Sequence, residues 1–151
     1  MAFVGQIHGS CVARDGAGVL LLGPSGAGKS DLALRLIDRG FALVADDRVD
    51  IAAGIARAPA ELAGLIEIRG LGIAQLAHTP EAPLALVVEL GVPERLPAPA
   101  VDPRFALPRI TLDARAASAA QRVALALAAA CARVGFVAGA FAAAVQGAAP
   151  P

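Results

Sequence analysis

The chain has 151 residues, 57% of them apolar, and its 13 basic side chains balance 13 acidic ones. This length predicts a single domain that buries enough surface to fold alone, and the zero net charge argues against a nucleic-acid partner. The two cysteines, Cys11 and Cys131, are far apart in the sequence and are expected to be small buried hydrophobes. No basic segment followed by a long apolar run opens the chain, so we expect a cytoplasmic location.

Apolar runs separated by turn signals predict strands and one helix in the first third of the chain. We expect a strand over 3–13, a turn at 15–16, a strand over 19–23, a helix over 29–40 and a strand over 41–45. Leu32, Leu36 and Ile37 give the helix an apolar face, and Gly40 is its expected C-terminal end. This alternation of strands and helices predicts an α/β domain.

The rest of the chain is expected to add strands, a proline-rich loop and a final helix. We expect a strand and turn over 49–59, a strand over 65–68 followed by a glycine-containing loop, a strand over 84–90, a loop from 91 that ends in a strand over 110–112, and a helix from Ser118. The domain is expected to cover residues 1–145, with a frayed tail over 146–151.

One segment, 123–145, is apolar and long enough to cross a bilayer. Arg133 lies near its middle, where a charge costs about 2.5–3.5 kcal/mol on membrane-insertion scales, and Gly135 and Gly139 interrupt it. We therefore expect a helix packed on the domain, and no membrane partner.

The sequence GPSGAGKS matches the phosphate-binding (Walker A) pattern G-x-x-x-x-G-K-[ST] at every fixed position. It follows an expected buried strand and opens an expected helix, which is the context that the pattern requires. Its glycines let N–H groups point at phosphate oxygens, Lys29 (the single lysine) can neutralise the last two phosphates, and Ser30 can bind Mg²⁺. The expected nucleotide-binding residues are Gly23, Pro24, Ser25, Gly26, Ala27, Gly28, Lys29 and Ser30. The reaction stays open, because GTPases, ATPases and small kinases share this loop.

Two adjacent carboxylates, Asp46 and Asp47, end the strand that follows this helix. Parallel strands joined by a helix end at one edge of a sheet, so both carboxylates are expected beside the phosphate loop. There, Mg²⁺ and Lys29 would offset the penalty of placing two like charges side by side. One carboxylate can contact the metal ion or its water shell, and the other can accept a proton from an attacking hydroxyl. A solvated turn, or metal binding without a base, is the plainer alternative.

Two further residues carry weaker signals. Glu67, in IEIRGLGI, is explained as well by a surface pair with Arg69, and His8, in IHGS, is more simply a packing residue. The residues alone leave both alternatives open.

Four stretches in this order at short intervals, IHGS, GPSGAGKSDLALRLIDRG, LVADDRVDI and IEIRGLGI, resemble the C-terminal catalytic domain of bacterial HPr kinase/phosphorylase. That family phosphorylates a serine of HPr, the small phosphocarrier protein of the sugar phosphotransferase system. The resemblance is clear over 4–73 and fainter to 136. It implies one P-loop kinase domain with a mixed central sheet flanked by helices, ATP and Mg²⁺ as cofactors, and an HPr-type protein as substrate.

The resemblance implies roles for the nucleotide side of the site. His8 falls at the family's active-site histidine and Lys29 at its catalytic lysine. Ser30 and Glu67 fall at the positions of its metal ligands.

On the substrate side, Asp47 falls at the acid/base that takes the serine proton, and Asp46 would support it. The segment PERLP resembles one that carries a catalytic arginine, which makes Arg95 a candidate.

Two departures from the family pattern affect the expected activity. The family commonly has a further N-terminal domain, so we expect a short form without it. It also has a basic loop containing Pro and Gly before its last helix, associated with removal of phosphate from the serine; the stretch 112–122 here keeps Arg115 and Arg122 but has neither Pro nor Gly. We therefore expect a kinase with weak or no reverse activity. The family forms hexamers, which makes a homo-oligomer an open expectation.

Two other functions remain as alternatives. A small-molecule kinase or NTPase would use the same loop without a protein substrate. A non-catalytic nucleotide-binding regulator would not need Asp47.

Overall fold

The structure, a computed structural model, describes residues 2–142, so the expected tail over 146–151 lies outside the described residues. Within this range the helices are α1 (Lys29–Asp38) and α2 (Ala119–Ala130), with a 3₁₀ turn at Ala60–Leu62. The strands are β1 (Gly5–His8), β2 (Ser10–Arg14), β3 (Ala17–Leu22), β4 (Ala42–Ala45), β5 (Arg48–Ala52), β6 (Ile55–Arg57), β7 (Leu65–Ile68), β8 (Gly72–Gln75), β9 (Glu81–Leu90), β10 (Val101–Asp102) and β11 (Leu107–Leu112).

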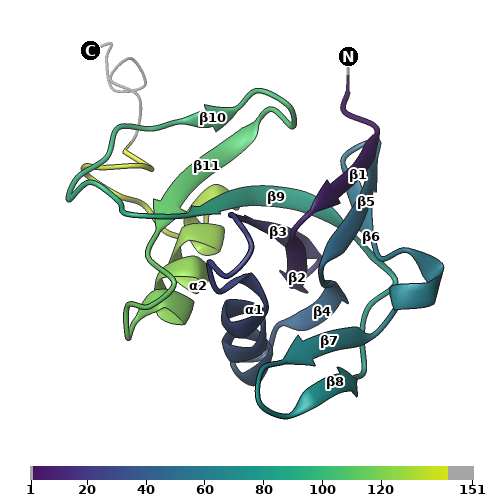
Figure 1. Ribbon diagram of the computed structural model, residues 1–151. Coiled ribbons are helices and arrows are strands. Elements are labelled where there is room, and N and C mark those ends of the chain that lie inside the picture. Colours follow the sequence, from purple (N-terminus) through teal and green to yellow (C-terminus); the bar gives the residue numbers. More distant parts are fainter. Residues whose placement is uncertain (1, 143–151) are drawn as a thin grey trace.

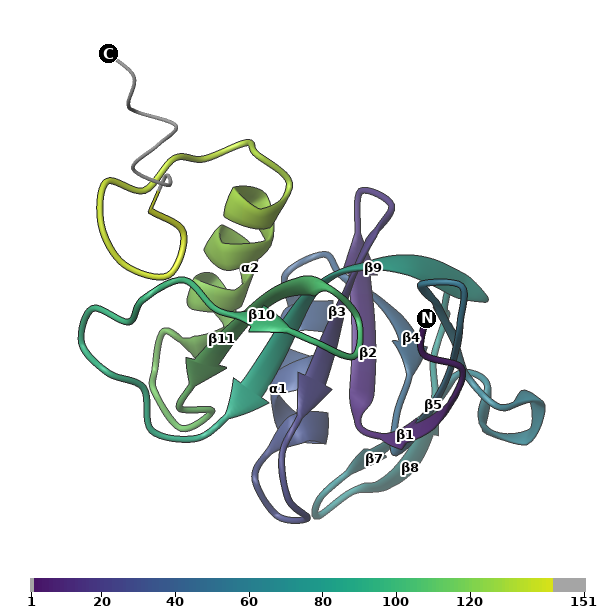
Figure 2. The ribbon, with the colours of Figure 1, turned by 90° about the horizontal axis from the view of Figure 1, so that it is seen from above.

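Nine of the strands form one large mixed sheet and β7 and β8 form a separate hairpin, which confirms the predicted α/β fold. Its main path runs β1-β5-β6-β9-β3-β2-β4, and β11 pairs with β9 and with β10. The long strand β9 joins the two halves, because it pairs antiparallel with β6 and parallel with both β3 and β11. Figure 2 shows the order β11, β9, β3, β2 and β4 across one half of the sheet.

The strands on either side of α1 are parallel, as predicted, but they are not neighbours. Strand β2 lies between β3 and β4 and runs antiparallel to both. Its first residue, Ser10, is opposite Leu21 near the end of β3, and Cys11 is opposite Ala45 at the end of β4. The start of β2 therefore lies at the sheet edge where β3 leads into the phosphate loop.

The single strand predicted over 3–13 is wrong, because the chain breaks it at Gly9. Strand β1 pairs with β5 in one half of the sheet, whereas β2 pairs with β3 and β4 in the other. A Cβ atom at Gly9 would lie 2.7 Å from the carbonyl oxygen of Leu21, closer than such contacts allow. Only glycine lets the chain cross between the two halves at this point without displacing β3.

Alternation along the strands fills two cores, one on each face of the sheet. Val19 and Leu21 of β3 pack with the helices on one face, and Leu20 and Leu22 pack under β5 and β6 on the other. Burial of each such side chain stabilises the fold by about 1.5–3 kcal/mol. In Figure 1, α1 lies between α2 and the β7–β8 hairpin, and it contacts both. The helix that carries Lys29 is thus held on three sides.

Helix α1 ends as the sequence predicted. Gly40 has φ of 100°, its N–H bonds to the carbonyl of Ile37, and the N–H of Phe41 bonds to the carbonyl of Leu36. This is a Schellman ending, in which Phe41 and Leu36 also meet in the core.

Helix α2 begins after Ser118, as predicted, and packs on the domain through residues such as Val123 and Leu127. It ends at Ala130, so the apolar run 123–145 does not continue as one helix. Ala132 has φ of 61°, and Arg133 turns back to bond the carbonyl of Ala128 and pair with Asp15. None of the helices described over 2–142 is both long and apolar enough to span a membrane.

Three predicted elements are longer or more regular than the sequence suggested. The glycine-containing loop after 68 is only a tight turn, because the chain returns at once as β8 and pairs with β7. Strand β9 begins at Glu81, ahead of Pro83, and β11 begins at Leu107, ahead of Pro108. Both strands thus pass through a proline, a residue that argues against a strand when the sequence is read alone.

Candidate functional site

The phosphate loop joins the end of β3 to the start of α1, as its sequence predicted. Gly26 has φ of 84° and Gly28 has φ of 100°, a conformation that side chains other than glycine rarely adopt. The loop therefore curls just before the first N–H groups of the helix. A curled run of N–H groups followed by a helix start is suited to binding phosphate.

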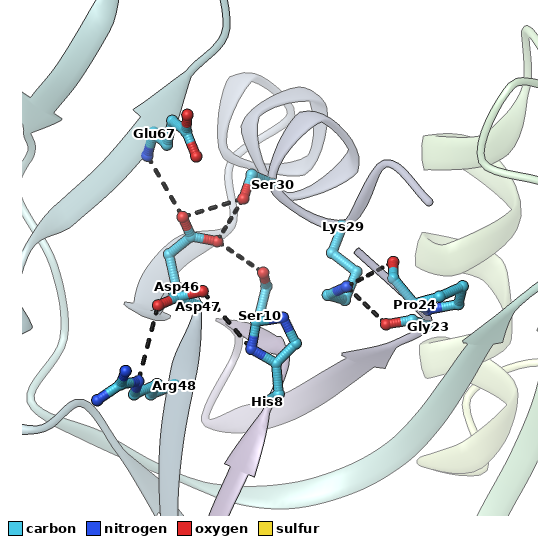
Figure 3. Close-up of polar contacts among 10 residues, drawn as sticks. All are labelled: His8, Ser10, Gly23, Pro24, Lys29, Ser30, Asp46, Asp47, Arg48 and Glu67. Carbon is cyan, nitrogen blue, oxygen red and sulfur yellow. Dashed lines mark hydrogen bonds and ion pairs between the residues drawn. The ribbon is translucent and has the colours of Figure 1, made fainter. Parts of the chain in front are cut away.

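Lys29 is buried at the first position of α1, with 7% of its surface exposed. Its Nζ atom donates hydrogen bonds to the carbonyl oxygens of Gly23, at 2.6 Å, and Pro24, at 3.0 Å (Figure 3). Among the described residues, no ion pair includes Lys29. A buried ammonium group held only by carbonyls has a strong requirement for an anion.

Asp46 is the centre of the acidic side of the site, and only 5% of it is exposed. Its carboxylate accepts hydrogen bonds from the hydroxyl of Ser10, at 2.6 Å, and from the hydroxyl of Ser30, at 2.8 and 3.0 Å. The backbone N–H of Glu67 donates a third bond at 3.3 Å. Asp46 thereby ties together the start of β2, helix α1 and strand β7, as Figure 3 shows.

Asp47 differs sharply from its neighbour, because the chain turns its side chain outward. It has φ of 72°, and the N–H of Arg48 bonds across it to the carbonyl of Asp46 at 2.8 Å. This is a γ-turn with a positive φ, which is rare and strained. The Asp47 carboxylate lies 3.5 Å from Nδ1 of His8 and 3.9 Å from Nε of Arg48. The turn thus gives two adjacent aspartates separate surroundings.

A cavity of about 340 Å³ collects most of the predicted site residues. Its lining includes His8, Gly26, Lys29, Ser30, Asp47 and Glu67. Arg95 is not part of this cavity: it is exposed in the loop after β9.

Sequence reasoning missed Ser10, which is fully buried and lines the cavity. The available signal was a lone hydroxyl at the start of the apolar run CVA, two residues after His8. Its importance depends on β2 lying between β3 and β4, which no local pattern in the sequence predicts.

The donor atoms beside Lys29 suit a nucleotide accompanied by Mg²⁺. Ser30 donates its proton to Asp46, so its oxygen lone pairs remain available, and Glu67 adds an exposed carboxylate. Mg²⁺ prefers such oxygen ligands and is usually held by one or two carboxylates together with substrate phosphates. Within residues 2–142, no three His, Cys, Asp or Glu side chains form a metal-binding group by themselves.

Comparisons with known proteins agree on one family. The model of the HPr Serine kinase C-terminal domain matches residues 1–80. This range includes His8, Lys29, both aspartates and Glu67, but not Arg95.

Two curated relatives and one solved structure are informative. HPr kinase/phosphorylase of Lactiplantibacillus plantarum is 50% identical over 73 residues, which are 45% of this chain and 23% of the relative. That of Limosilactobacillus reuteri is 42% identical over 97 residues, which are 56% and 30% of the two chains. The chain therefore spans less than a third of the length of these relatives.

The solved structure is the Hpr(Ser) kinase/phosphatase from Coxiella burnetii. It superposes with a TM-score of 0.66 at 28% identity, over 81% of this chain and 87% of that one. The similarity extends well beyond residues 1–80, so it supports the same fold for the second half of the chain.

We predict that Asp47→Gly stabilises the protein. Glycine adopts the positive φ at this position without strain, so the free energy of unfolding should rise by about 1 kcal/mol. Urea denaturation measures it. Ala53→Gly, at an exposed turn residue with φ of 53°, should change stability in the same direction.

The matched control is Ala128→Gly inside α2, which should lose about 1 kcal/mol because glycine is less favourable than alanine in a helix interior. An equal loss for Asp47→Gly would show that the γ-turn is not strained.

Proposed function

Since the chain belongs to the family of the HPr serine kinase C-terminal domain, we propose that it is an ATP-dependent kinase acting on a serine of HPr or a related phosphocarrier protein. The observation that carries this proposal is the division of one cavity into two parts. A buried lysine without an ion pair among the described residues lies at the phosphate loop, and an outward-turned aspartate lies across from it.

The nucleotide side is proposed to be residues 23–30. The curled loop and the start of α1 bind the phosphates of ATP, and Lys29 exchanges its carbonyl partners for phosphate oxygens. Ser30 and Glu67 would hold Mg²⁺, which neutralises charge on the phosphates when it is bound. Asp46 keeps Ser30 in place through two hydrogen bonds and so acts as a positioning residue.

The substrate side is proposed to centre on Asp47. Its exposed carboxylate accepts the proton of the serine hydroxyl as the serine oxygen forms a bond to the terminal phosphorus. The bond from that phosphorus to the oxygen of ADP breaks, and ADP leaves with the electron pair. His8, 3.5 Å from Asp47, holds the carboxylate in position and stabilises its negative charge when the ring is protonated.

Four further points belong to the proposal. Arg95 would join the site only if the loop after β9 moved toward it, so its catalytic role stays a prediction. The protein would act in the cytoplasm, and it would form homo-oligomers as its family does. Reverse activity would be weak, because the segment between β11 and α2 is a short turn region without the Pro and Gly of the family loop.

We predict that purified protein transfers one phosphoryl group from Mg-ATP to HPr of the same organism. Asp47→Asn should keep ATP binding but reduce transfer about 100- to 10,000-fold, because the amide cannot accept the serine proton. Intact-mass spectrometry of HPr measures the transfer, and calorimetry measures ATP binding.

The matched control is Asp38→Asn, an exposed carboxylate on α1 outside the cavity, which should transfer at the wild-type rate. Phosphorylation of a small molecule but not of HPr would assign the site to another kinase class. ATP binding without transfer to any acceptor would assign the protein to nucleotide-binding regulators.

We also predict little reverse reaction. Phosphoserine-HPr incubated with the protein and inorganic phosphate should lose its phosphoryl group at least about tenfold more slowly than HPr gains it, and pyrophosphate should not accumulate. A reverse rate equal to the forward rate would show that the loop containing Pro and Gly is dispensable.

A further inference from the structure

A second cavity, of about 580 Å³, lies on the other side of the phosphate loop. It shares Gly26, Gly28 and Asp31 with the first cavity, so the loop separates the two. Its other walls are the segment 90–92 after β9 and the segment 113–115 after β11. None of the roles proposed above uses it.

The orientation of a nucleotide bound at the phosphate loop indicates which part of it would lie in the second cavity. In the proposed reaction the terminal phosphate must lie in the first cavity, beside Asp47 and Glu67. A triphosphate is a linear chain, so its nucleoside end leaves the phosphate loop on the side away from these groups. Resting on the proposed function, we propose that the second cavity binds the ribose and base of the nucleotide.

The walls have the surfaces that a flat base requires. Leu90, Val92 and Ala114 are apolar, and Val92 is 88% exposed, so most of its surface is accessible to a ligand. The side chain of Arg115 is 91% exposed, and its planar guanidinium group can stack on a base. Apolar walls with a few polar groups are typical of small-molecule sites.

The wall formed by 113–115 is fixed to the helix that carries Lys29. Arg35 of α1 donates hydrogen bonds to the carbonyls of Ala114 and Ala116 and pairs with Asp31 at 3.2 Å. A Cβ atom at Gly28 would lie 3.3 Å from that of Ala114, so this wall touches the phosphate loop itself.

The two walls are also joined to each other. The N–H of Gly91 bonds to the carbonyl of Leu112 at 2.9 Å. Both walls therefore keep a fixed position relative to a nucleotide bound by the loop.

A competing location for the base lies within the first cavity, whose lining continues to Leu34, Ile68 and Arg69. A base bound there would lie against the β7–β8 hairpin instead. The two locations fall on different tryptic peptides, because cleavage after arginine separates 58–69 from 70–95 and from 110–115.

The test is photolabelling of the full chain with 8-azido-ATP and Mg²⁺, followed by tryptic digestion and fragment sequencing by mass spectrometry. Label protected by ATP should fall on 90–92 or 113–115. Label on 68–69 would overturn the inference while leaving the kinase proposal intact.

Calorimetry separates the nucleoside contact from the phosphate contact. Arg115→Ala should weaken ATP binding about three- to tenfold, the effect of losing one stacking contact, and should change binding of inorganic triphosphate less than about twofold. Arg122→Ala, on α2 outside both cavities, is the control for the lost positive charge. It should change neither the affinity for ATP nor the affinity for triphosphate.

The remaining outcomes are decisive as well. If Arg115→Ala weakened the binding of ATP and of triphosphate equally, or weakened neither, the assignment of the second cavity to the nucleoside would be overturned and the kinase proposal would stand. Failure of the wild-type chain to bind both ATP and triphosphate would overturn the proposed function, and the inference with it.

Discussion

The organisation of the site depends on two buried charges of opposite sign that do not meet. Lys29 and Asp46 are 7% and 5% exposed, yet Lys29 is held by two backbone carbonyls and Asp46 by two hydroxyls and an N–H. A direct ion pair would neutralise both groups and close the site. Kept apart, Lys29 gives a cationic side that suits phosphate, and Asp46 fixes Ser30 on the opposite side, where a metal ion would bind. Such buried charges cost stability unless a ligand compensates them, so this arrangement is better explained by binding than by folding.

The topology of the sheet keeps these charges apart: Lys29 lines the cavity, whereas Asp46 lies behind it, bonded to the lining residues Ser10 and Ser30. Strand β2 lies between β3 and β4, so the two parallel strands that carry the loop and the aspartates are separated by a third. The same strand brings Ser10 under Asp46, and the break at Gly9 carries His8 to the outer side, next to Asp47. The γ-turn at Asp47 completes the division, since it leaves one aspartate buried as a structural acceptor and exposes the other. Strain at this one residue gives two identical side chains different chemistry.

Local patterns predicted the parts of this arrangement that depend on neighbours in the sequence. The phosphate loop, the extent of α1 with Gly40 at its end, and the two aspartates at one edge all follow from spacing and turn chemistry. The position of β2, the break at Gly9 and the contact of Ser10 with Asp46 depend on strand pairing between distant segments, which periodicity does not encode. The end of α2 was missed for another reason. Alanine has a high helix propensity at any position, so the alanine-rich run from 123 contains no residue that signals a helix end before the turn at Ala132. The different surroundings of Asp46 and Asp47 come from a single backbone angle and could not be read from two identical letters.

The central claim is that the buried lysine exists to bind the phosphates of a nucleotide. The most direct measurement is a calorimetric titration of Mg-ATP into the wild-type chain and into Lys29→Met, a variant of similar length without the charge. We predict that the wild-type chain binds and that the variant binds about 10- to 100-fold more weakly, the effect of losing a hydrogen bond to a charged group. Its unfolding temperature without ligand should be unchanged or higher, because an uncompensated buried charge is removed. Equal affinity of the two proteins, or no binding by the wild-type chain, would contradict this account of the site.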